Sequence, residues 1–487
     1  MRRTMKLIPL LALVLIPNLA GAAEIAPPLG DGVAPAEPPG FDLVGHSPLE
    51  NRGMNAALAV HGDYAYVGSR TDAKAQNANN AGVFVVDISD TSAPEVVHQI
   101  GPPDEGNTGE TSREMRIWHS QEVLIVMTLF SNCGEIHACT PVEGVDRFKF
   151  YDISGKNAAE PKLIATYDPS LNPHEFFLWE DPKRPKRALF FNSNTGGGAQ
   201  QLTVTDISDW RKGKFTEIVK MSPLYNGGNL HSLSISPDGK TGYLAHLAGG
   251  VGVIDTSEIA RNAKKPQVRV VTAPANAPRW EGPGPHSAVP LFNKDYMLIT
   301  DEVYGEALRA LGGHGCPWGW MRMVSIANPA KPKVVSDYRL EQNHQEYCTT
   351  DAPRPTSSYS AHNPTLTPNL AFITWHSGGL QAVDISNPKK PTQVTEYLPT
   401  PVLPVIQEDP VLSSGPDKIV MWSYPIIKNG LIYVVDVRNG LYILRYNGPF
   451  EKEVDKIKFL EGNSNLGDAV RLERDPRGVI REPHPVS

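Results

Sequence analysis

The chain has 487 residues and a formal net charge of −7 at pH 7, with 46 basic residues against 53 acidic ones. This length exceeds one ordinary compact domain unless the architecture is repetitive. The mild acidity and the lack of a basic stripe argue against nucleic acid as a partner.

The N-terminus predicts an export signal. Basic residues among the first six precede an apolar stretch at residues 7–19, and small residues at 20–22 suit signal-peptide cleavage. The apolar stretch is too short to span a bilayer comfortably, and no later stretch replaces it. We therefore expect a signal peptide at residues 1–22, a Pro/Gly-rich linker at 23–40, no transmembrane segment, and a periplasmic or extracellular location.

Export places the four cysteines in an oxidising compartment, where disulfides persist. Four cysteines allow three pairings, and proximity along the chain or on one face favours Cys133–Cys139 and Cys316–Cys348. A thiolate metal site is the alternative, which this compartment disfavours.

A strand that ends in an acidic turn recurs along the chain and defines a repeat. It reads VVDIS at residues 85–89, FYDIS at 150–154 and AVDIS at 382–386, and most copies precede a proline turn and a further strand. The copies lie about 50 to 70 residues apart, and a period near 50 with insertions is typical of a propeller. The repeated position is occupied by Asp87, Asp152, Asp206, Asp255, Ser325 and Asp384.

Seven copies of four strands predict an all-β fold, a seven-bladed β-propeller at residues 41–448, followed by a C-terminal tail at 449–487. The seventh copy, at 441–445, is degenerate and has no obvious fourth strand. Residues 41–46 have the pattern of that strand, so we expect the N-terminal strand to close the last blade. Closure hides sheet edges that otherwise template aggregation. The charged tail is expected to pack on the outside.

The copies at residues 85–89 and 382–386, each followed by a proline turn, resemble the LVIVD-repeat family of secreted β-propellers. The resemblance covers about residues 41–447 and implies architecture rather than function. Residues 370–391, which contain WHSGG and DISNP, are more distantly similar to the selenium-binding-protein and methanethiol-oxidase propellers. This second likeness implies a metal-dependent oxidase of small sulfur compounds.

Histidine begins the first strand of four consecutive blades. The first strand of a propeller blade lines the central channel, so its first residue lies at one mouth of that channel. Four imidazoles that converge on an axis suit iron, copper or zinc. The alternative is that they hydrogen-bond backbone groups at the mouth. The predicted metal ligands are His174, His231, His286 and His362.

The other blades place Asn55, Glu114 and Tyr424 at about the same position, which would leave one side of a metal open for substrate or water. Carboxylates beside imidazoles fix their tautomer and raise their basicity. The alternative is that the acidic residues are ordinary polar strand ends. The predicted catalytic residues are Glu114, Glu175, Glu302 and Tyr424.

Two long insertions, at residues 131–145 and 305–320, belong to the same mouth and are expected to form a disulfide-tied lid. Aromatic side chains there would wall a pocket for an apolar or aromatic molecule, although packing between blades is the alternative for each tryptophan. The predicted pocket residues are His246, Asp301, Trp318, Trp320, His376 and Trp422.

These patterns predict a secreted metal-dependent oxidase or oxygenase of a small apolar or aromatic molecule. The compartment and the four-nitrogen ligand set favour iron or copper over zinc, whose structural sites are closed. The alternative is a non-catalytic propeller that presents one face to protein or glycan partners.

Overall fold

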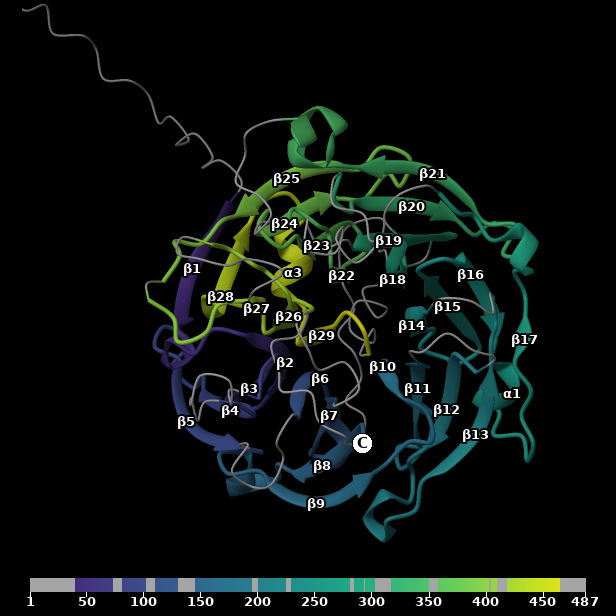
Figure 1. The fold of residues 1–487 in the computed structure, drawn as a ribbon, viewed down its shortest axis with the longest axis horizontal. Helices are drawn as coiled ribbons and strands as arrows, with labels where there is room; N and C mark the ends of the chain where they lie inside the picture. The colour runs from purple at the N-terminus through teal and green to yellow at the C-terminus, as the bar shows by residue number, and fades with distance from the viewer. Residues whose placement is uncertain are drawn as a thin grey trace, which may run out of the picture. The chain divides into compact units, whose positions relative to one another are not determined.

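Seven antiparallel sheets are arranged in a ring within the unit that spans residues 39–487 (Figure 1). The fold is therefore the predicted seven-bladed β-propeller. The computed structural model describes residues 40–72, 81–101, 110–129, 145–194, 200–224, 229–280, 284–292, 294–302, 317–349, 358–402, 404–409 and 418–464.

Each of the first six blades has four strands, counted outwards from the channel. Blade one has β2 (Asn55–His61), β3 (Tyr64–Ser69), β4 (Val83–Asp87) and β5 (Glu95–Ile100). Blade two has β6 (Thr111–Trp118), β7 (Val123–Leu129), β8 (Arg147–Asp152) and β9 (Lys162–Tyr167). Blade three has β10 (Pro173–Glu180), β11 (Ala188–Asn194), β12 (Leu202–Asp206) and β13 (Thr216–Met221).

The remaining blades follow in chain order. Blade four has β14 (Leu230–Ile235), β15 (Thr241–His246), β16 (Gly250–Asp255) and β17 (Arg269–Val270). Blade five has β18 (Gly284–Pro290), β19 (Tyr296–Glu302), β20 (Met321–Ser325) and β21 (Lys333–Tyr338). Blade six has β22 (Pro364–Leu366), β23 (Leu370–Thr374), β24 (Leu380–Asp384) and β25 (Thr392–Tyr397). Blade seven contains β26 (Ile426–Lys428), β27 (Leu431–Asp436) and β28 (Gly440–Asn447), joined by β1 (Gly40–Ser47) and β29 (Phe459–Glu461).

The inner strands are buried on both faces because each blade packs against two neighbours. All seven residues of β7 are buried, whereas the outermost strand β21 contains only exposed and half-buried residues. The helices α1 (Ser257–Ala260) and α3 (Glu451–Asp455) are each about one turn long. No helix in the described part of the chain is long and apolar enough to cross a membrane.

The repeated aspartate forms the same local turn in each blade where it occurs. Its side chain accepts a hydrogen bond from the backbone N–H two residues later, at 2.8 Å for Asp87 and 2.9 Å for Asp152. This Asx turn ends the third strand of the blade and redirects the chain towards the fourth. The same bond is made by Asp206, Asp255 and Asp384.

The N-terminal strand closes the ring, as the sequence predicts. β1 pairs antiparallel with β28 and is the outermost strand of the last blade. Phe41 of β1 also reaches across to blade six, where its ring centroid lies 6.1 Å from that of Phe372. The missing fourth strand of the seventh repeat is thus supplied by the other end of the chain.

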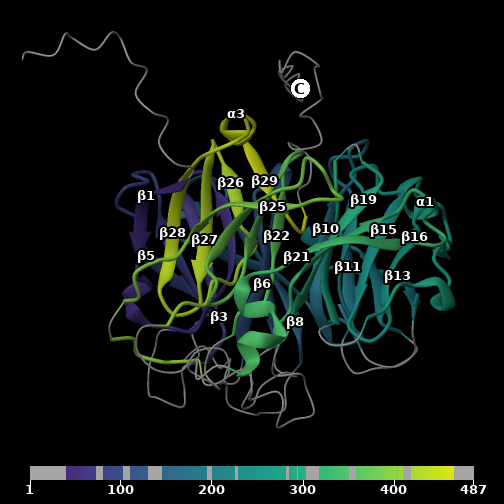
Figure 2. The same ribbon diagram turned by 90° about the horizontal axis from the view of Figure 1, so that it is seen from above.

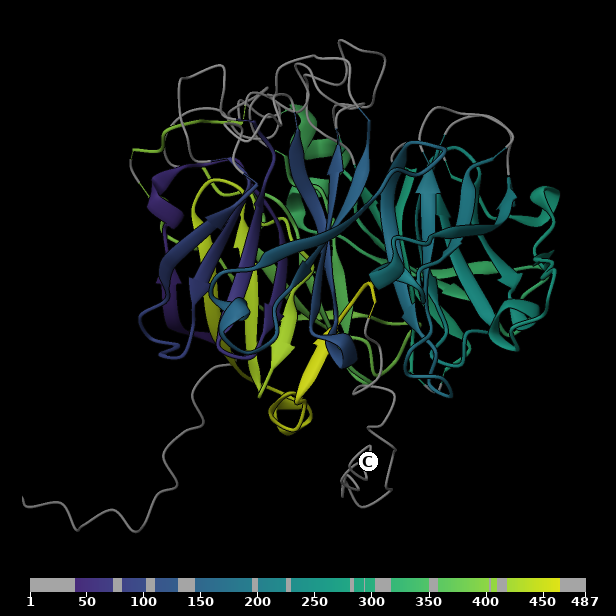
Figure 3. The same ribbon diagram turned by 90° about the horizontal axis from the view of Figure 1, so that it is seen from below.

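The C-terminal segment differs from the prediction. β29 pairs with β26 on the side of blade seven that faces the channel, so the expectation that the tail packs outside is wrong for residues 459–464. Side views show α3 at one end of the ring and β29 returning towards its centre (Figures 2 and 3). The Ser464 hydroxyl lies within hydrogen-bonding distance of Leu178 N and Arg116 Nε, on the inner strands of blades three and two. Without β29, the inner edge of β26 would present unpaired backbone N–H and C=O groups to the channel, and β29 pairs with them.

Candidate metal centre

Three of the hub histidines are the extra residues of β-bulges. In β10, β14 and β18 the pairing with the next strand skips one residue, and the skipped residues are His174, His231 and His286. A bulge leaves its extra residue outside the ladder and re-aims the side chain. His362 lies two residues before β22, at the same end of blade six.

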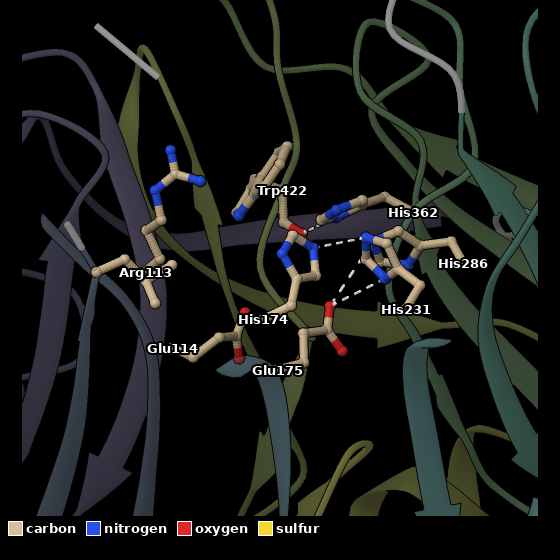
Figure 4. A pocket seen from close by; sticks show the side chains of 9 residues that line it. Arg113, Glu114, His174, Glu175, His231, His286, His362 and Trp422 are labelled. Carbon is tan, nitrogen blue, oxygen red and sulfur yellow. Dashed lines mark hydrogen bonds and ion pairs between the residues drawn. The ribbon is translucent and has the colours of Figure 1, made fainter. Parts of the chain in front are cut away.

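The four imidazoles lie side by side at one mouth of the channel (Figure 4). Successive ring centroids, from His174 to His231, His286 and His362, are 4.3, 3.9 and 4.3 Å apart. The Nε2 atoms of His174 and His231 are 2.9 Å apart. The sequence prediction that these four side chains converge agrees with this geometry.

Hydroxyl groups tie three of the four histidines to the preceding blade. In each case a Ser or Thr of one blade donates a hydrogen bond to the backbone carbonyl of the histidine in the next. The pairs are Ser193 with His231 at 2.6 Å, Ser232 with His286 at 2.6 Å, and Thr300 with His362 at 2.5 Å. These bonds fix the spacing of neighbouring histidines.

Two carboxylates contact the imidazoles. Glu302, the last residue of β19, places Oε2 3.3 Å from His286 Nε2 and Oε1 3.2 Å from His362 Nε2. The same Oε1 lies 3.4 Å from Nε2 of His376, a fifth imidazole at the cluster. Glu175 Oε1 lies 3.7 Å from both His231 Nδ1 and His286 Nε2.

Two overlapping groups of these side chains bring their donor atoms within 4.8 Å of one another, which is close enough to hold a metal ion. One group is Glu175, His231 and His286, and the other is His286, Glu302 and His362. Imidazole nitrogen and carboxylate oxygen are both common ligands of transition metals.

Burial keeps these imidazoles neutral near pH 7. It lowers the pKa of His362 to about 3 and that of His174 to about 4, where the Arg113 charge adds to the effect. Burial also lowers the pKa values of His231 and His286 well below their usual range. A neutral imidazole has the lone pair that a metal requires.

The tautomer of His362 follows from its hydrogen bond. Its Nδ1 lies 2.7 Å from the carbonyl oxygen of Trp422, which only accepts, so Nδ1 carries the proton. Nε2 therefore presents a lone pair to Glu302 Oε1. In metal-binding histidines, one ring nitrogen typically donates a hydrogen bond to a carbonyl or carboxylate oxygen, which fixes the tautomer and leaves the other nitrogen for the metal.

Blade two presents an arginine at the hub. The pairing of β6 skips Arg113, so Arg113 and not Glu114 occupies the position of the bulged histidines. Glu114 corresponds instead to Glu175, the residue after the bulge. The sequence RE at residues 113–114 corresponds to HE at residues 174–175 and shows this register, in which arginine takes the place of histidine.

Glu114 and Tyr424 line a small pocket together with Trp422. Glu114 pairs with Arg116 at 3.0 Å, and Arg116 also contacts Glu461 of β29 at 3.1 Å. The Tyr424 hydroxyl lies 3.2 Å from Ser287 Oγ, which is 2.8 Å from His286 Nδ1. Burial raises the pKa of Tyr424 well above its usual range, so this hydroxyl keeps its proton.

A small cavity of about 30 Å³ opens beside the imidazoles. This volume suits a ligand the size of one or two water molecules in the side-chain positions observed. The cavity is lined by the four hub histidines together with Arg113, Glu114, Leu129, Glu175 and Trp422.

The predicted pocket residues separate into two sets. Trp422 lines the cavity and His376 contacts Glu302, so both belong to the cluster. The other residues do not line the cavity and have other contacts. His246 is hydrogen-bonded to Gln201 and Gly249, and Asp301 pairs with Arg322. Trp320 stacks against the guanidinium groups of Arg322 and Arg339. Trp318 packs against Tyr347 and Tyr359.

The predicted disulfides and the lid lie outside the described residues. Cys133, Cys139 and Cys316 are not in the described ranges, nor is the side chain of Cys348. Both pairings therefore stay predictions.

Parts of the chain are similar to known proteins. The model of the LVIVD repeat matches residues 52–100 and 365–398, in blades one and six. The solved structure of the periplasmic gluconolactonase PpgL of Pseudomonas aeruginosa matches at 12% sequence identity and a TM-score of 0.45, over 78% of this chain and 93% of that one. No curated protein matches the sequence. The chain is a seven-bladed β-propeller that carries LVIVD repeats.

Proposed function

We propose that the hub cluster binds one transition metal ion and that the protein is a metal-dependent oxidoreductase of a small molecule with an apolar or aromatic body. The observation that carries this proposal is the contact between His362 Nε2 and Glu302 Oε1, at 3.2 Å. Both atoms are electron-pair donors when the imidazole is neutral and the carboxyl is ionised. Two such atoms repel each other unless a cation or a proton lies between them.

His362 is the histidine that most needs a cation. Nδ1 of His286 and Nδ1 of His376 lie beside serine hydroxyls, which can donate, so the Nε2–H groups of these two rings can donate to Glu302. The proton of His362 is on Nδ1, so its Nε2 has none to give to the carboxylate. A metal ion between Nε2 of His362 and Glu302 would satisfy both groups.

The nitrogen spacing fits metal ligation. Metal–imidazole bonds are about 2.0–2.1 Å long, so two ligands at a right angle place their nitrogens about 2.9 Å apart. The Nε2 atoms of His174 and His231 have this separation, 2.9 Å, which also suits a hydrogen bond between the two rings. Imidazole-rich sites suit iron and copper, and we propose these metals over zinc.

The chain's own residues define what the site does. A bound iron or copper ion would supply redox and Lewis-acid chemistry at this mouth of the channel. The imidazoles would hold this ion, and Trp422 and Leu129 provide an apolar wall. The imidazole side chains of His231, His286 and His362 are buried, which keeps bulk water away from the site. The likeness of residues 370–391 to selenium-binding-protein propellers points in the same direction and stays a prediction.

Elemental analysis after reconstitution with iron or copper tests the proposal. Wild type should hold about one metal ion per chain, whereas His231→Ala and His362→Ala should lose most of it. His98→Ala is the matched control, because His98 lies on the outer strand β5, and it should bind metal like wild type. A wild type that stays metal-free contradicts the proposal and leaves the alternative, a propeller that binds protein or glycan partners.

We also propose export from the cytoplasm, on the N-terminal sequence alone. Cell fractionation should find the protein outside the cytoplasm, and N-terminal sequencing should find a start near residue 23. A cytoplasmic protein that retains residues 1–22 would contradict this.

A further inference from the structure

Three imidazoles turn Nε2 towards the carboxyl group of Glu302. They belong to His286, His362 and His376, at distances of 3.2–3.4 Å. A neutral imidazole has one N–H group and one lone pair, so the partner of Nδ1 decides which of the two Nε2 presents. The three rings differ in that partner.

His362 and His286 have chemically different partners at Nδ1. The carbonyl oxygen of Trp422 lies 2.7 Å from Nδ1 of His362, and a carbonyl only accepts hydrogen bonds. The hydroxyl of Ser287 lies 2.8 Å from Nδ1 of His286, and a hydroxyl can donate or accept. The carbonyl therefore permits one tautomer of its histidine, whereas the hydroxyl permits both.

The same arrangement recurs at the fifth imidazole of the cluster. The hydroxyl of Ser358 lies 3.0 Å from Nδ1 of His376, and both residues are fully buried. His376 also has a backbone φ of 38°, in the left-handed region that non-glycine residues rarely adopt. A strained backbone persists only where its surroundings enforce it, so this ring is held in place between the serine and Glu302.

Tyr424 lets the Ser287 hydroxyl point either way. The Tyr424 hydroxyl lies 3.2 Å from Ser287 Oγ, and either group can be the donor. When Ser287 donates to His286, its oxygen accepts from Tyr424. When Ser287 accepts from His286, it donates to the Tyr424 oxygen, and the tyrosine hydroxyl can turn to its own pocket of about 10 Å³, which has room for about one water.

We propose that Ser287 and Ser358 are positioning residues that set, and can exchange, the tautomers of His286 and His376. In the metal-free protein each hydroxyl donates to Nδ1, so the imidazole proton is on Nε2 and is donated to Glu302. When Nε2 binds a cation, the same hydroxyl accepts from Nδ1–H. The imidazole loses one proton at Nε2 and gains one at Nδ1, so it stays neutral. This exchange, unlike the metal-free tautomers, rests on the proposed metal-dependent function.

Nitrogen NMR on the metal-free full chain, with isotope-labelled histidine, tests the first half of the proposal. Single-histidine variants assign the resonances. We expect a protonated Nε2 in His286 and His376 and a protonated Nδ1 in His362. Ser287→Ala should shift the Nδ1 resonance of His286, because a hydrogen bond to that lone pair is lost, and Ser287→Thr, which keeps a hydroxyl, should restore it. A proton on Nδ1 of His286, or a resonance that does not respond to Ser287→Ala, overturns the proposal.

Zinc is a diamagnetic probe for the second half, because it also takes imidazole ligands. Saturation with zinc should move the proton of His286 to Nδ1. Ser287→Ala should weaken zinc binding about tenfold, a typical loss when the partner of a ligating imidazole is removed, and Ser287→Thr should bind nearly as wild type does. Ser234→Ala is the matched control, because Ser234 is equally buried, on the inner strand β14 three residues after His231, and it should bind zinc like wild type.

The outcomes distinguish the two proposals. Zinc uptake that leaves the proton of His286 on Nε2, or equal zinc affinity of wild type and Ser287→Ala, overturns the exchange of tautomers while the metal site stands. If wild type takes up no zinc, iron or copper, the proposed function fails and the exchange fails with it. The metal-free spectra then still decide whether the serines set the tautomers. Thermal melting of each variant shows that the fold is retained.

Discussion

At the scale of single residues, the hydroxyl bonds between blades hold the hub histidines. Thr300 is fully buried and donates to the carbonyl oxygen of His362. Thr300→Val keeps the shape but removes this donor, so it should lower the free energy of unfolding by about 1–2 kcal/mol. Calorimetric melting checks this against Thr216→Val, an exposed position on β13 that should change little. Equal melting of the two variants would show that the bond contributes nothing.

Glu180 makes a residue-scale prediction about pH. Burial raises the pKa of Glu180 from 4.5 to about 7, although Ser120 donates a hydrogen bond to its carboxylate. The folded chain thus holds the proton more tightly than the unfolded chain, so this residue lowers stability as pH rises from about 4.5 to about 7. Glu180→Gln removes the ionisation, and its melting temperature relative to wild type should be higher at pH 8 than at pH 5. If the difference in melting temperature between Glu180→Gln and wild type is the same at both pH values, burial does not raise the pKa of Glu180.

At the scale of elements, β1 closes the ring and removes an exposed edge from β28. Deletion of residues 24–47 should sharply lower the melting temperature, because it also removes Phe41 from its contacts with Phe372 and Tyr446. Phe41→Ala, which removes the ring contacts with Phe372, Tyr397 and Tyr446 at a half-buried site, should cost about 2 kcal/mol. Deletion of residues 24–38 keeps all of β1 and is the control. An unchanged melting curve for the longer deletion would mean that the blade does not need its fourth strand.

The strand β29 is the second element whose removal is informative. A chain that ends at residue 456 lacks Leu460, which is fully buried, and Glu461, which pairs with the buried Arg116. The truncation removes a fully buried leucine and one of the two carboxylates that pair with Arg116, whose other partner Glu114 remains, so it should cost about 2–5 kcal/mol and melt well below wild type. A chain that ends at residue 464 keeps β29 and is the control for shortening. Similar melting of the two truncations would argue that β29 adds no stability.

At the scale of the whole molecule, one metal held by blades three to six would cross-link more than half of the ring. A ligand that binds only the folded state stabilises it by about 2.7 kcal/mol at a free concentration 100 times its dissociation constant. Copper or iron should therefore raise the melting temperature of wild type and His98→Ala, and a chelator should reverse the change. His231→Ala should respond much less. An equal response of all three proteins would indicate binding elsewhere.

The sequence by itself determined the architecture, because the features that specify it are local. The Asx turn at Asp87 and its copies, the proline turn and the following strand recur about every 50 to 70 residues, and four-stranded repeats of this kind bury their faces against their neighbours in a propeller. The four histidines could be found for the same reason, since each occupies the same place in its own repeat. The pairing of Phe41–His46 with the last blade followed from counting strands.

Only the tertiary structure decided which further side chains meet those histidines. A bulge adds one residue to a strand, and a shift of one residue exchanged Arg113 for Glu114 at the hub. Glu302 and His376 come from the ends of second strands or the turns after them, so their distance to the imidazoles depends on how the blades pack. The pairing of β29 with the inner edge of β26 is also a tertiary contact, because nothing in the local sequence at residues 459–461 names that partner.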